Sequence, residues 1–273
     1  MSVTAQAIRR AGQTVGFVPT MGALHDGHLS LIRTARRQTP LVVVSIFVNP
    51  LQFGPEEDFE RYPRDLKRDL NLAKAAGCGV VFAPDASQMY PADFRTSVQV
   101  EELSERFEGA SRPGHFRGVA TVVIKLFHLV QPAVAYVGQK DYQQAVLIQR
   151  MVKDLSLPVQ VRLVPTVREP DGLAMSSRNA LLTAQERRDA PVLYRALVAA
   201  KEQIRAGERD PERLLDEMRR LISRGSSARI DYLAVVNART LEPLEQVRGH
   251  VAVLGALRLG ATRLIDNLLV DVS

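Results

Sequence analysis

The first two-thirds of the chain alternate short apolar runs with amphipathic segments. The apolar runs predict five strands, at 15–19, 41–48, 79–82, 134–137 and 159–164. The run LVVVSIFV at 41–48 is almost continuously apolar and rich in β-branched residues, as a parallel strand buried on both faces would be. Helical spacing is found between the runs, at 28–38, 65–76, 119–130 and 142–155. This alternation predicts an α/β fold, with a parallel sheet covered by helices on both faces.

The pattern changes after about residue 166. The sequence TAQE at 183–186 has the form of a capping box and predicts a helix whose apolar stripe continues to Ile204. A second helix is expected after Asp210, because the following proline suits the first helical position. Three strand-like runs come last, at 230–236, 251–254 and 262–265. We therefore predict two domains: residues 1–166 with the parallel sheet, and residues 167–273 as a smaller α+β domain.

Composition narrows the class of protein only a little. No apolar run is long enough to span a bilayer, and the single cysteine, Cys78, excludes an intramolecular disulfide and a multi-cysteine metal site. We expect a cytoplasmic protein with no membrane partner. The net charge of +6 allows an anionic partner without choosing among nucleic acid, phosphate and carboxylate, and a solvated basic surface would explain it equally well.

Two of the five histidines lie in the sequence PTMGALHDGH at 19–28. His25 and His28 are three residues apart where a predicted strand gives way to a helix, so both should lie on one helix face. A helix start offers unpaired N–H groups and the positive end of the dipole, which suit nucleotide phosphates. Two alternatives are a metal pair, although no third ligand is obvious, and ordinary capping or surface histidines.

Polar segments follow two other predicted strands, where ligands of parallel sheets bind. Asn49 and Gln52 come after the most apolar strand and could bond a polar substrate, or could simply form a turn. Lys140 follows the strand at 134–137 and is a natural phosphate partner, and Asp141 beside it could cap the next helix.

Three further features are a loop, a basic turn and a histidine in an apolar helix. The loop MSSRN at 175–179 carries two hydroxyls and a guanidinium, so it could close over phosphates, or it could be a serine-rich linker. The turn RPGHFRG at 112–118 is basic and could face an acidic substrate group. His128 lies in an apolar helical run and is expected to be a core residue.

Taken together, these segments resemble the pantothenate synthetase (pantoate–β-alanine ligase) family of the HxGH nucleotidyltransferase superfamily. The matching stretches occur in the family's order: PTMGALHDGH at 19–28, FVNPLQFGPEEDFERYPR at 47–64, RPGHFRGVATVV at 112–123, GQKDYQQ at 138–144 and DGLAMSSRN at 171–179. The resemblance implies a Rossmann-like first domain, with the second domain closing over the site. It implies that pantoate attacks ATP to give pantoyl adenylate and pyrophosphate, and that β-alanine then displaces AMP to give pantothenate.

The resemblance also implies site residues. His28 would be the catalytic histidine, and we expect His25, Lys140 and Arg178 to assist it. Gln52 and Gln144 would hold pantoate, and Gln52 would border β-alanine. ATP would lie on residues of both domains: Met21, Gly22, Ala23, Leu24, His25, Asp26, Gly27, His28, Gly138, Gln139, Lys140, Asp141, Val167, Met175, Ser176, Ser177 and Arg178. The family often has glutamate where Gln139 stands, a difference from which we expect little effect.

A magnesium ion would accompany ATP, and the resemblance implies a cytoplasmic homodimer. Asp69 is a magnesium candidate, although it could equally be a charge on a helix surface. One rival function is that of another HxGH nucleotidyltransferase, such as a cytidylyltransferase or a small adenylyltransferase, which would need neither NPLQFG nor the Gln52 and Gln144 pair. The other is nucleic-acid binding. We expect no nucleic-acid partner, because the chain has no recognisable RNA-binding module and no tryptophan.

Overall fold

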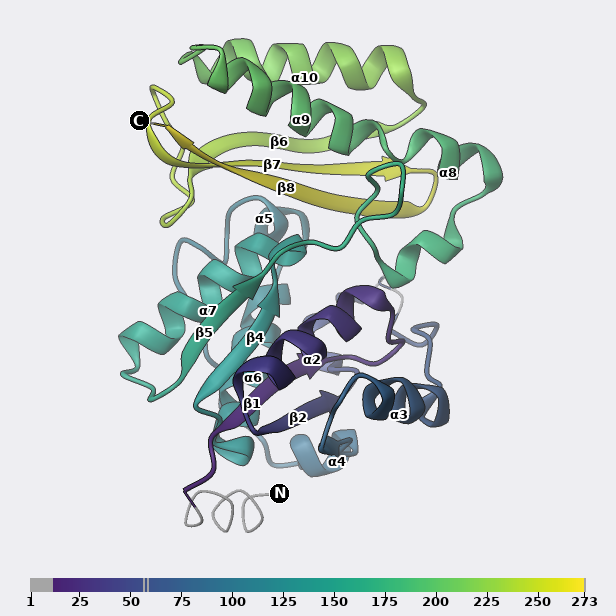
Figure 1. Cartoon of the computed structure of the whole chain (residues 1–273), viewed down its shortest axis with the longest axis vertical. Coiled ribbons are helices and arrows are strands. Elements are labelled where there is room, and N and C mark those ends of the chain that lie inside the picture. Colours follow the sequence, from purple (N-terminus) through teal and green to yellow (C-terminus); the bar gives the residue numbers. More distant parts are fainter. Residues whose placement is uncertain (1–11, 56, 58, 273) are drawn as a thin grey trace. The chain divides into compact units, whose positions relative to one another are not determined.

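The computed structural model describes residues 12–55, 57 and 59–272, and it divides the chain into two compact units (Figure 1). The first unit lies within Met1–Gln139 and Gln143–Pro165, and the second within Lys140–Tyr142 and Thr166–Ser273. The predicted domain boundary falls one residue later, after residue 166. The prediction also assigned the segment 140–142 to the first domain, whereas its contacts group it with the second unit.

The first unit contains the predicted parallel sheet, which confirms the α/β fold. Its strands are β1 (Val15–Thr20), β2 (Leu41–Ile46), β3 (Val80–Phe82), β4 (Val134–Gly138) and β5 (Gln160–Val164). They lie in the order β3-β2-β1-β4-β5, and every neighbouring pair is parallel.

Side chains alternate between the two faces of this sheet and are buried on both. Val18, Val42 and Val44 pack with helices α2 (Asp26–Gln38) and α3 (Leu66–Ala75). Phe17 and Val43 face the other way, toward α6 (His115–Val130) and α7 (Tyr142–Asp154). The nearly continuous apolar runs of the sequence follow from this burial on two sides.

The strand order places β1 in the middle of the sheet. From β1 the chain moves outward to β2 and β3, and it later returns to the other side of β1 to form β4 and β5. The order therefore reverses between β1 and β4. In open α/β sheets the ligand crevice lies outside the carboxyl ends of the strands at such a switch point. His25 and His28 follow β1, and Gln139 follows β4, so these residues leave the sheet on both sides of that point.

The second unit is built on an antiparallel sheet of three strands, β6 (Arg229–Asn237), β7 (Gly249–Leu259) and β8 (Thr262–Val272), in the order β6-β7-β8. Helices α9 (Val192–Arg205) and α10 (Pro211–Gly225) lie along one face of this sheet and bury an apolar core against it (Figure 1). The predicted smaller α+β fold is confirmed.

The prediction of one continuous helix after Thr183 was wrong. The stretch that begins after Thr183 forms two helices, α8 (Ala184–Asp189) and α9, with Pro191 at the N-cap of α9. Proline lacks the N–H that a continuing helix would need at this point, and it therefore favours a break.

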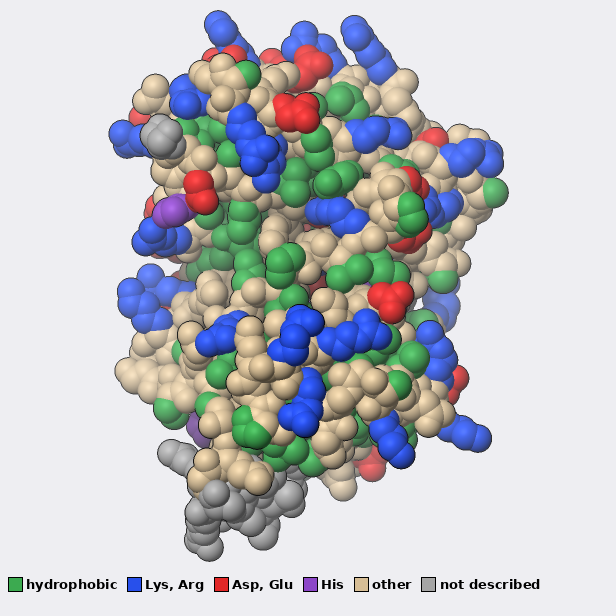
Figure 2. Space-filling model, viewed as in Figure 1, with side chains coloured by type: hydrophobic (Ala, Val, Ile, Leu, Met, Phe, Trp, Pro, Cys, Tyr) green, Lys and Arg blue, Asp and Glu red, His purple; other side chains and the backbone are tan. Residues whose placement is uncertain are grey.

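Several short elements were not predicted: α4 (Ala86–Met89), α5 (Glu108–Ser111), and the 3-10 turns η1 (Pro50–Gln52), η2 (Gln139–Asp141) and η3 (Ser177–Leu181). The expectation that His128 is a core residue was wrong, because its side chain is exposed at the end of α6 and its Nδ1 lies 2.8 Å from the carbonyl of Ile124. Basic side chains outnumber acidic ones on the visible face of Figure 2, in line with the net charge of +6.

Candidate active site

The side chains of His25 and His28 together cap the N-terminus of helix α2. The Nδ1 atom of His25, the N-cap residue, accepts a hydrogen bond from the backbone N–H of Gly27 at 3.1 Å. The Nδ1 atom of His28 accepts one from the backbone N–H of His25 at 3.3 Å. The two rings lie side by side, with centroids 4.1 Å apart. The capping interpretation of these residues and the phosphate-binding one are therefore compatible.

This pairing determines the tautomer of both rings. A neutral imidazole has one N–H donor and one acceptor nitrogen. Since Nδ1 accepts in His25 and in His28, each proton lies on Nε2. Both side chains can thus offer an Nε2–H donor at the start of a helix, where the dipole also favours an anion.

Asp69 holds the turn that leads into the histidines. Its two carboxylate oxygens accept hydrogen bonds from the backbone N–H groups of Ala23 and Leu24, each at 2.8 Å. The turn includes Gly22 at φ +84° and Ala23 at φ +51°. A side chain at position 22 would suffer both from this backbone conformation and from Asp69, whose Oδ2 would lie 2.9 Å from the added Cβ.

These contacts bear on the predicted magnesium role of Asp69. The side chain is only 1% exposed, and both of its oxygens are used by the turn. Across the part of the chain that the structure describes, no group of three or more His, Cys, Asp or Glu side chains could hold a metal ion. Asp69 therefore does not fit a magnesium ligand, and its geometry favours a structural role.

Gln52 reaches the histidine turn from the end of β2. It is 8% exposed, and its Nε2 lies 2.9 Å from the sulfur of Met21. Its Oε1 accepts a hydrogen bond from Asn49 Nδ2 at 3.1 Å, and Tyr90 donates to Asn49 Oδ1 at 2.8 Å. The amide of Gln52 is thus oriented with its oxygen toward Asn49 and its NH₂ group toward Met21.

The backbone carbonyl of Gln52 is contacted by two side chains around the start of α6, those of Arg112 and of the first helical residue, His115. His115 Nδ1 lies 2.8 Å from this oxygen, and Arg112 Nη2 lies 3.4 Å from it. Arg112 also makes a two-pronged ion pair with Glu57. Burial and the charge of Arg112 lower the pKa of His115 to about 4. Burial acts to raise the pKa of Glu57, but its hydrogen bond with Arg112 and the charge of Arg112 bring it below its usual value.

The two glutamines at the start of α7 differ in their surroundings. Gln143 is buried, accepts from the backbone N–H of Glu108, and donates to the carbonyls of Leu103 and Arg106. Gln144 is only partly buried. The structure therefore gives Gln143 a packing role and leaves Gln144 as the glutamine that can meet a substrate.

In the second unit, Lys140 is held through its backbone. Asn267, 1% exposed on β8, donates from Nδ2 to the Lys140 carbonyl at 3.0 Å. Tyr142 donates to the carbonyl of Ala238 at 2.8 Å. Next to Asn267, Arg168 pairs with Asp266, and burial raises the pKa of the Asp266 carboxyl against the pull of Arg168.

The loop at 175–179 belongs to the same unit. The backbone N–H of Met175 donates to the carbonyl of Val167 at 3.0 Å, and Ser176 caps the turn η3 by accepting from the N–H of Arg178 at 3.2 Å. Asn179 donates to the carbonyl of Ala174 at 3.1 Å. The segment is thus an ordered turn, unlike a flexible serine-rich linker.

The predicted site residues are divided between the units. The first unit contains residues 21–28, Gln52, Gly138, Gln139 and Gln144, and the contact of Gln52 with Met21 joins two of these segments. The second contains Lys140, Asp141, Val167 and residues 175–178. Sequence reasoning considered His115 only as part of the basic turn at 112–118, and it gave no role to Glu57 or Asn267. The only available signal for Asn267 was a polar pair, Asp266 and Asn267, inside an apolar strand.

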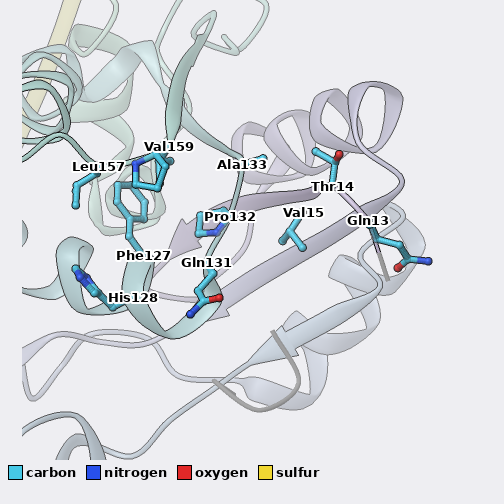
Figure 3. Close-up of a pocket in the computed structure, with 12 residues that line it drawn as sticks. Gln13, Thr14, Val15, Phe127, His128, Gln131, Pro132, Ala133, Leu157 and Val159 are labelled. Atoms are coloured by element: carbon cyan, nitrogen blue, oxygen red, sulfur yellow. The ribbon is translucent and has the colours of Figure 1, made fainter. Parts of the chain in front are cut away.

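A cavity of about 430 Å³ opens at the end of the parallel sheet opposite to the carboxyl ends of its strands (Figure 3). It is lined by Val15 at the start of β1, by Ala133 just before β4 and by Val159 just before β5, with Phe127 and Leu157 beside them. These positions mark the amino ends of the strands. None of the predicted site residues lines this cavity, so it is separate from the candidate active site.

Comparisons with known proteins agree on one family. The sequence profile of the family described as Pantoate-beta-alanine ligase matches residues 1–269. A pantothenate synthetase of Moorella thermoacetica is 56% identical over 267 residues, which are 98% of this chain and 94% of that protein. One of Heliobacterium modesticaldum is 57% identical over 263 residues, covering 96% of this chain and 94% of that protein.

Solved structures give the same result. The crystal structure of pantothenate synthetase from Thermus thermophilus has a TM-score of 0.92 and 52% identity, covering 97% of this chain and 96% of that one. The pantoate-beta-alanine ligase of Francisella tularensis, complexed with "Beta-gamma ATP and Beta-alanine", has a TM-score of 0.79 and 35% identity, covering 98% of this chain and 95% of that one. From the profile, the relatives and the fold together, this chain belongs to the pantoate–β-alanine ligase family.

Proposed function

We propose that this chain condenses pantoate with β-alanine at the expense of ATP, giving pantothenate, AMP and pyrophosphate through a pantoyl adenylate. The family match over residues 1–269 supports this ligase activity over that of a cytidylyltransferase or other HxGH nucleotidyltransferase. One observation of geometry carries the proposal. His25 and His28 present Nε2–H donors at the start of α2, and the amide of Gln52 reaches the same turn through Met21.

In the first step, a carboxylate oxygen of pantoate attacks the α-phosphorus of ATP. The bond from this phosphorus to the bridging oxygen breaks, and pyrophosphate leaves with the electron pair. Negative charge grows on the α-phosphate oxygens and on the leaving group, so donors aimed at these atoms lower the barrier. We assign the α-phosphate to His25 and His28, and the charge of the departing pyrophosphate to Lys140 and Arg178, with Ser176 and Ser177 as further donors.

The substrate acid is assigned to the two neutral amides, Gln52 and Gln144. An amide can bond the hydroxyls and the carboxylate of pantoate without forming an ion pair that would hold back the nucleophile. In the second step the amine of β-alanine attacks the acyl carbon, the bond from this carbon to the AMP oxygen breaks with the electron pair leaving on AMP, and the amine gives its proton to solvent. Gln52 would border the β-alanine position, and backbone groups of the turns at 21–28 and 138–141 would contact the nucleotide.

The test is ATP–pyrophosphate exchange with the purified chain. We expect exchange that requires pantoate and does not require β-alanine, followed by formation of pantothenate and AMP when β-alanine is added. Exchange without any acid, or transfer of a nucleotide to a phosphorylated alcohol, would contradict the proposal and favour the other nucleotidyltransferases. Tight RNA binding that falls steeply with salt would favour the nucleic-acid alternative.

Four expectations remain part of the proposal. Magnesium would enter with the phosphates of ATP, where it keeps much of its water shell and needs few protein ligands. Residues 167–273 would close over the nucleotide. The chain would be a homodimer, to be tested by light scattering, and would be located in the cytoplasm. Within the described residues no helix is long and apolar enough to cross a membrane.

A further inference from the structure

Three side chains from two segments, Glu57 from one and Arg112 and His115 from the other, form a chain of contacts that ends on the backbone of Gln52. Glu57 accepts from Arg112 Nε and Nη2, each at 2.6 Å. The remaining guanidinium nitrogen, Nη1, lies 3.0 Å from His115 Nε2. His115 Nδ1 then lies 2.8 Å from the Gln52 carbonyl oxygen.

The direction of each hydrogen bond in this chain follows from the groups themselves. A guanidinium only donates, so Nε2 of His115 must accept from Arg112. The proton of the neutral ring is then on Nδ1, which donates to the Gln52 carbonyl. Glu57, held ionised by Arg112, keeps the guanidinium turned toward His115. The low pKa of His115, about 4, agrees with a neutral ring at physiological pH.

The same stretch of backbone is also pressed against α6. A Cβ atom on Gly118 would collide with the carbonyl group of Leu51, so only glycine allows this approach. The Gly118 carbonyl accepts a hydrogen bond from Asn49 Nδ2 at 3.1 Å, and Asn49 donates to the side chain of Gln52 as well. Gln52 is therefore held at its backbone carbonyl and at its Oε1 atom, while its NH₂ group faces Met21.

We propose that Glu57, Arg112 and His115 are positioning residues that fix the backbone of Gln52 and so aim its amide at pantoate. This inference rests on the proposed function, in which Gln52 binds pantoate. It also changes the interpretation of Arg112. The basic turn suggested a partner for an acidic substrate group, but its guanidinium is used by Glu57, His115 and the Gln52 carbonyl.

A purely structural role would predict a different set of effects. Loss of stability alone would lower the active fraction and reduce every rate together. Loss of positioning acts on one substrate, because Gln52 is assigned to pantoate and not to ATP. The two roles are therefore separated by measuring the half-saturating concentrations of pantoate and ATP on the same variant.

The variants follow from the geometry of the ring. His115→Leu removes the donor to the Gln52 carbonyl. His115→Asn can place its Nδ2 near the position of Nδ1 and restore that donor. His128→Leu is the matched control, because it removes an exposed histidine at the far end of the same helix α6. Glu57→Gln weakens the ion pair without touching the ring, and it serves if His115→Leu does not fold.

We expect His115→Leu to raise the half-saturating pantoate concentration in exchange by at least about fivefold, the value of one ordinary hydrogen bond. The half-saturating concentration of ATP should change by less than about twofold. His115→Asn should recover most of the loss, Glu57→Gln should shift pantoate in the same direction, and His128→Leu should change neither substrate. The inference would be overturned if the half-saturating concentrations of pantoate and ATP changed in parallel. It would also be overturned if His115→Asn were as impaired as His115→Leu. Pantoate-independent exchange in the unmodified chain would instead contradict the proposed function.

Discussion

The Nδ1 atom of His28 accepts a hydrogen bond from the backbone N–H of His25 at 3.3 Å. This contact ties the ring of His28 to the helix start and leaves the proton on Nε2, which can donate a hydrogen bond to a phosphate oxygen. Under the proposed function, each histidine thus has two roles on two different nitrogen atoms. Since asparagine and glutamine each imitate only one of those nitrogens, the two roles can be tested separately.

For His28, we expect asparagine and glutamine to have opposite effects. His28→Asn keeps an acceptor near Nδ1 and loses the Nε2 donor, so exchange should fall on the order of 10²–10³-fold with little change in stability. His28→Gln should lose about 1 kcal/mol of stability with the cap and retain more activity. Urea unfolding and ATP–pyrophosphate exchange measure the two effects. Equal activity in both variants would remove the Nε2 donor from the mechanism.

Gln52→Ala should raise the half-saturating pantoate concentration by at least about tenfold, because a substrate hydroxyl left unpaired costs roughly 1–3 kcal/mol. ATP affinity without pantoate should change little. Calorimetric titration of ATP and exchange kinetics with pantoate give both quantities on one variant. If ATP binding collapses while the pantoate requirement stays the same, Gln52 belongs to the nucleotide site.

Lys140→Ala should slow adenylate formation more than the reaction of preformed pantoyl adenylate with β-alanine, since pyrophosphate has left by the second step. Asn267→Ala should show a weaker form of the same defect, because Asn267 holds the Lys140 carbonyl. Single-turnover measurements of each half-reaction provide the comparison. Lys153→Ala, which removes an exposed lysine in the last turn of α7, is the control. Equal losses in both half-reactions would indicate a structural role for Lys140.

Asp69→Asn tests the structural role of Asp69 against the magnesium one. The amide can accept from only one of the two N–H groups of Ala23 and Leu24, so the free energy of unfolding should fall by roughly 1–3 kcal/mol. The magnesium concentration that gives half-maximal exchange should stay within about twofold of its original value. A large rise in that concentration with unchanged stability would restore Asp69 as a metal ligand.

The low pKa of His115 predicts a dependence of stability on pH. The folded ring titrates at about 4 and an unfolded histidine at about 6.5, so the unfolded chain binds the extra proton between these values. The contribution of the His115 ring to the free energy of unfolding is therefore fully present above about pH 6.5. It falls as the pH drops toward 4, by up to about 3 kcal/mol. Urea unfolding of the original chain and of His115→Gln, at pH 7 and pH 5, should show a smaller decline in the variant. The same decline in both would exclude His115 as the source.

Local patterns in the sequence were sufficient to place the elements of the parallel sheet. Strand β2 was predicted at 41–48 and ends at Ile46, and the helix predicted at 65–76 became α3, Leu66–Ala75. Periodicity and burial on both sides determine these elements within short segments. The helix break at Pro191 was not predicted, because the apolar stripe continues from one helix into the next. The proline in the sequence was the signal that could have predicted it.

The sequence by itself also located the chemistry at the ends of strands, because the order of strands and turns is a property of the chain. What it could not decide was which side chains meet. Asp69 was a possible magnesium ligand or surface charge until the fold placed its carboxylate on Ala23 and Leu24. Arg112 was a free cation for an acidic group until the fold placed it between Glu57 and His115. Asp69 lies more than forty residues from Ala23 and Leu24, and Glu57 lies 55 residues from Arg112. Only tertiary packing brings such distant polar atoms to hydrogen-bonding distance, and neither periodicity nor capping signals in the sequence report on it.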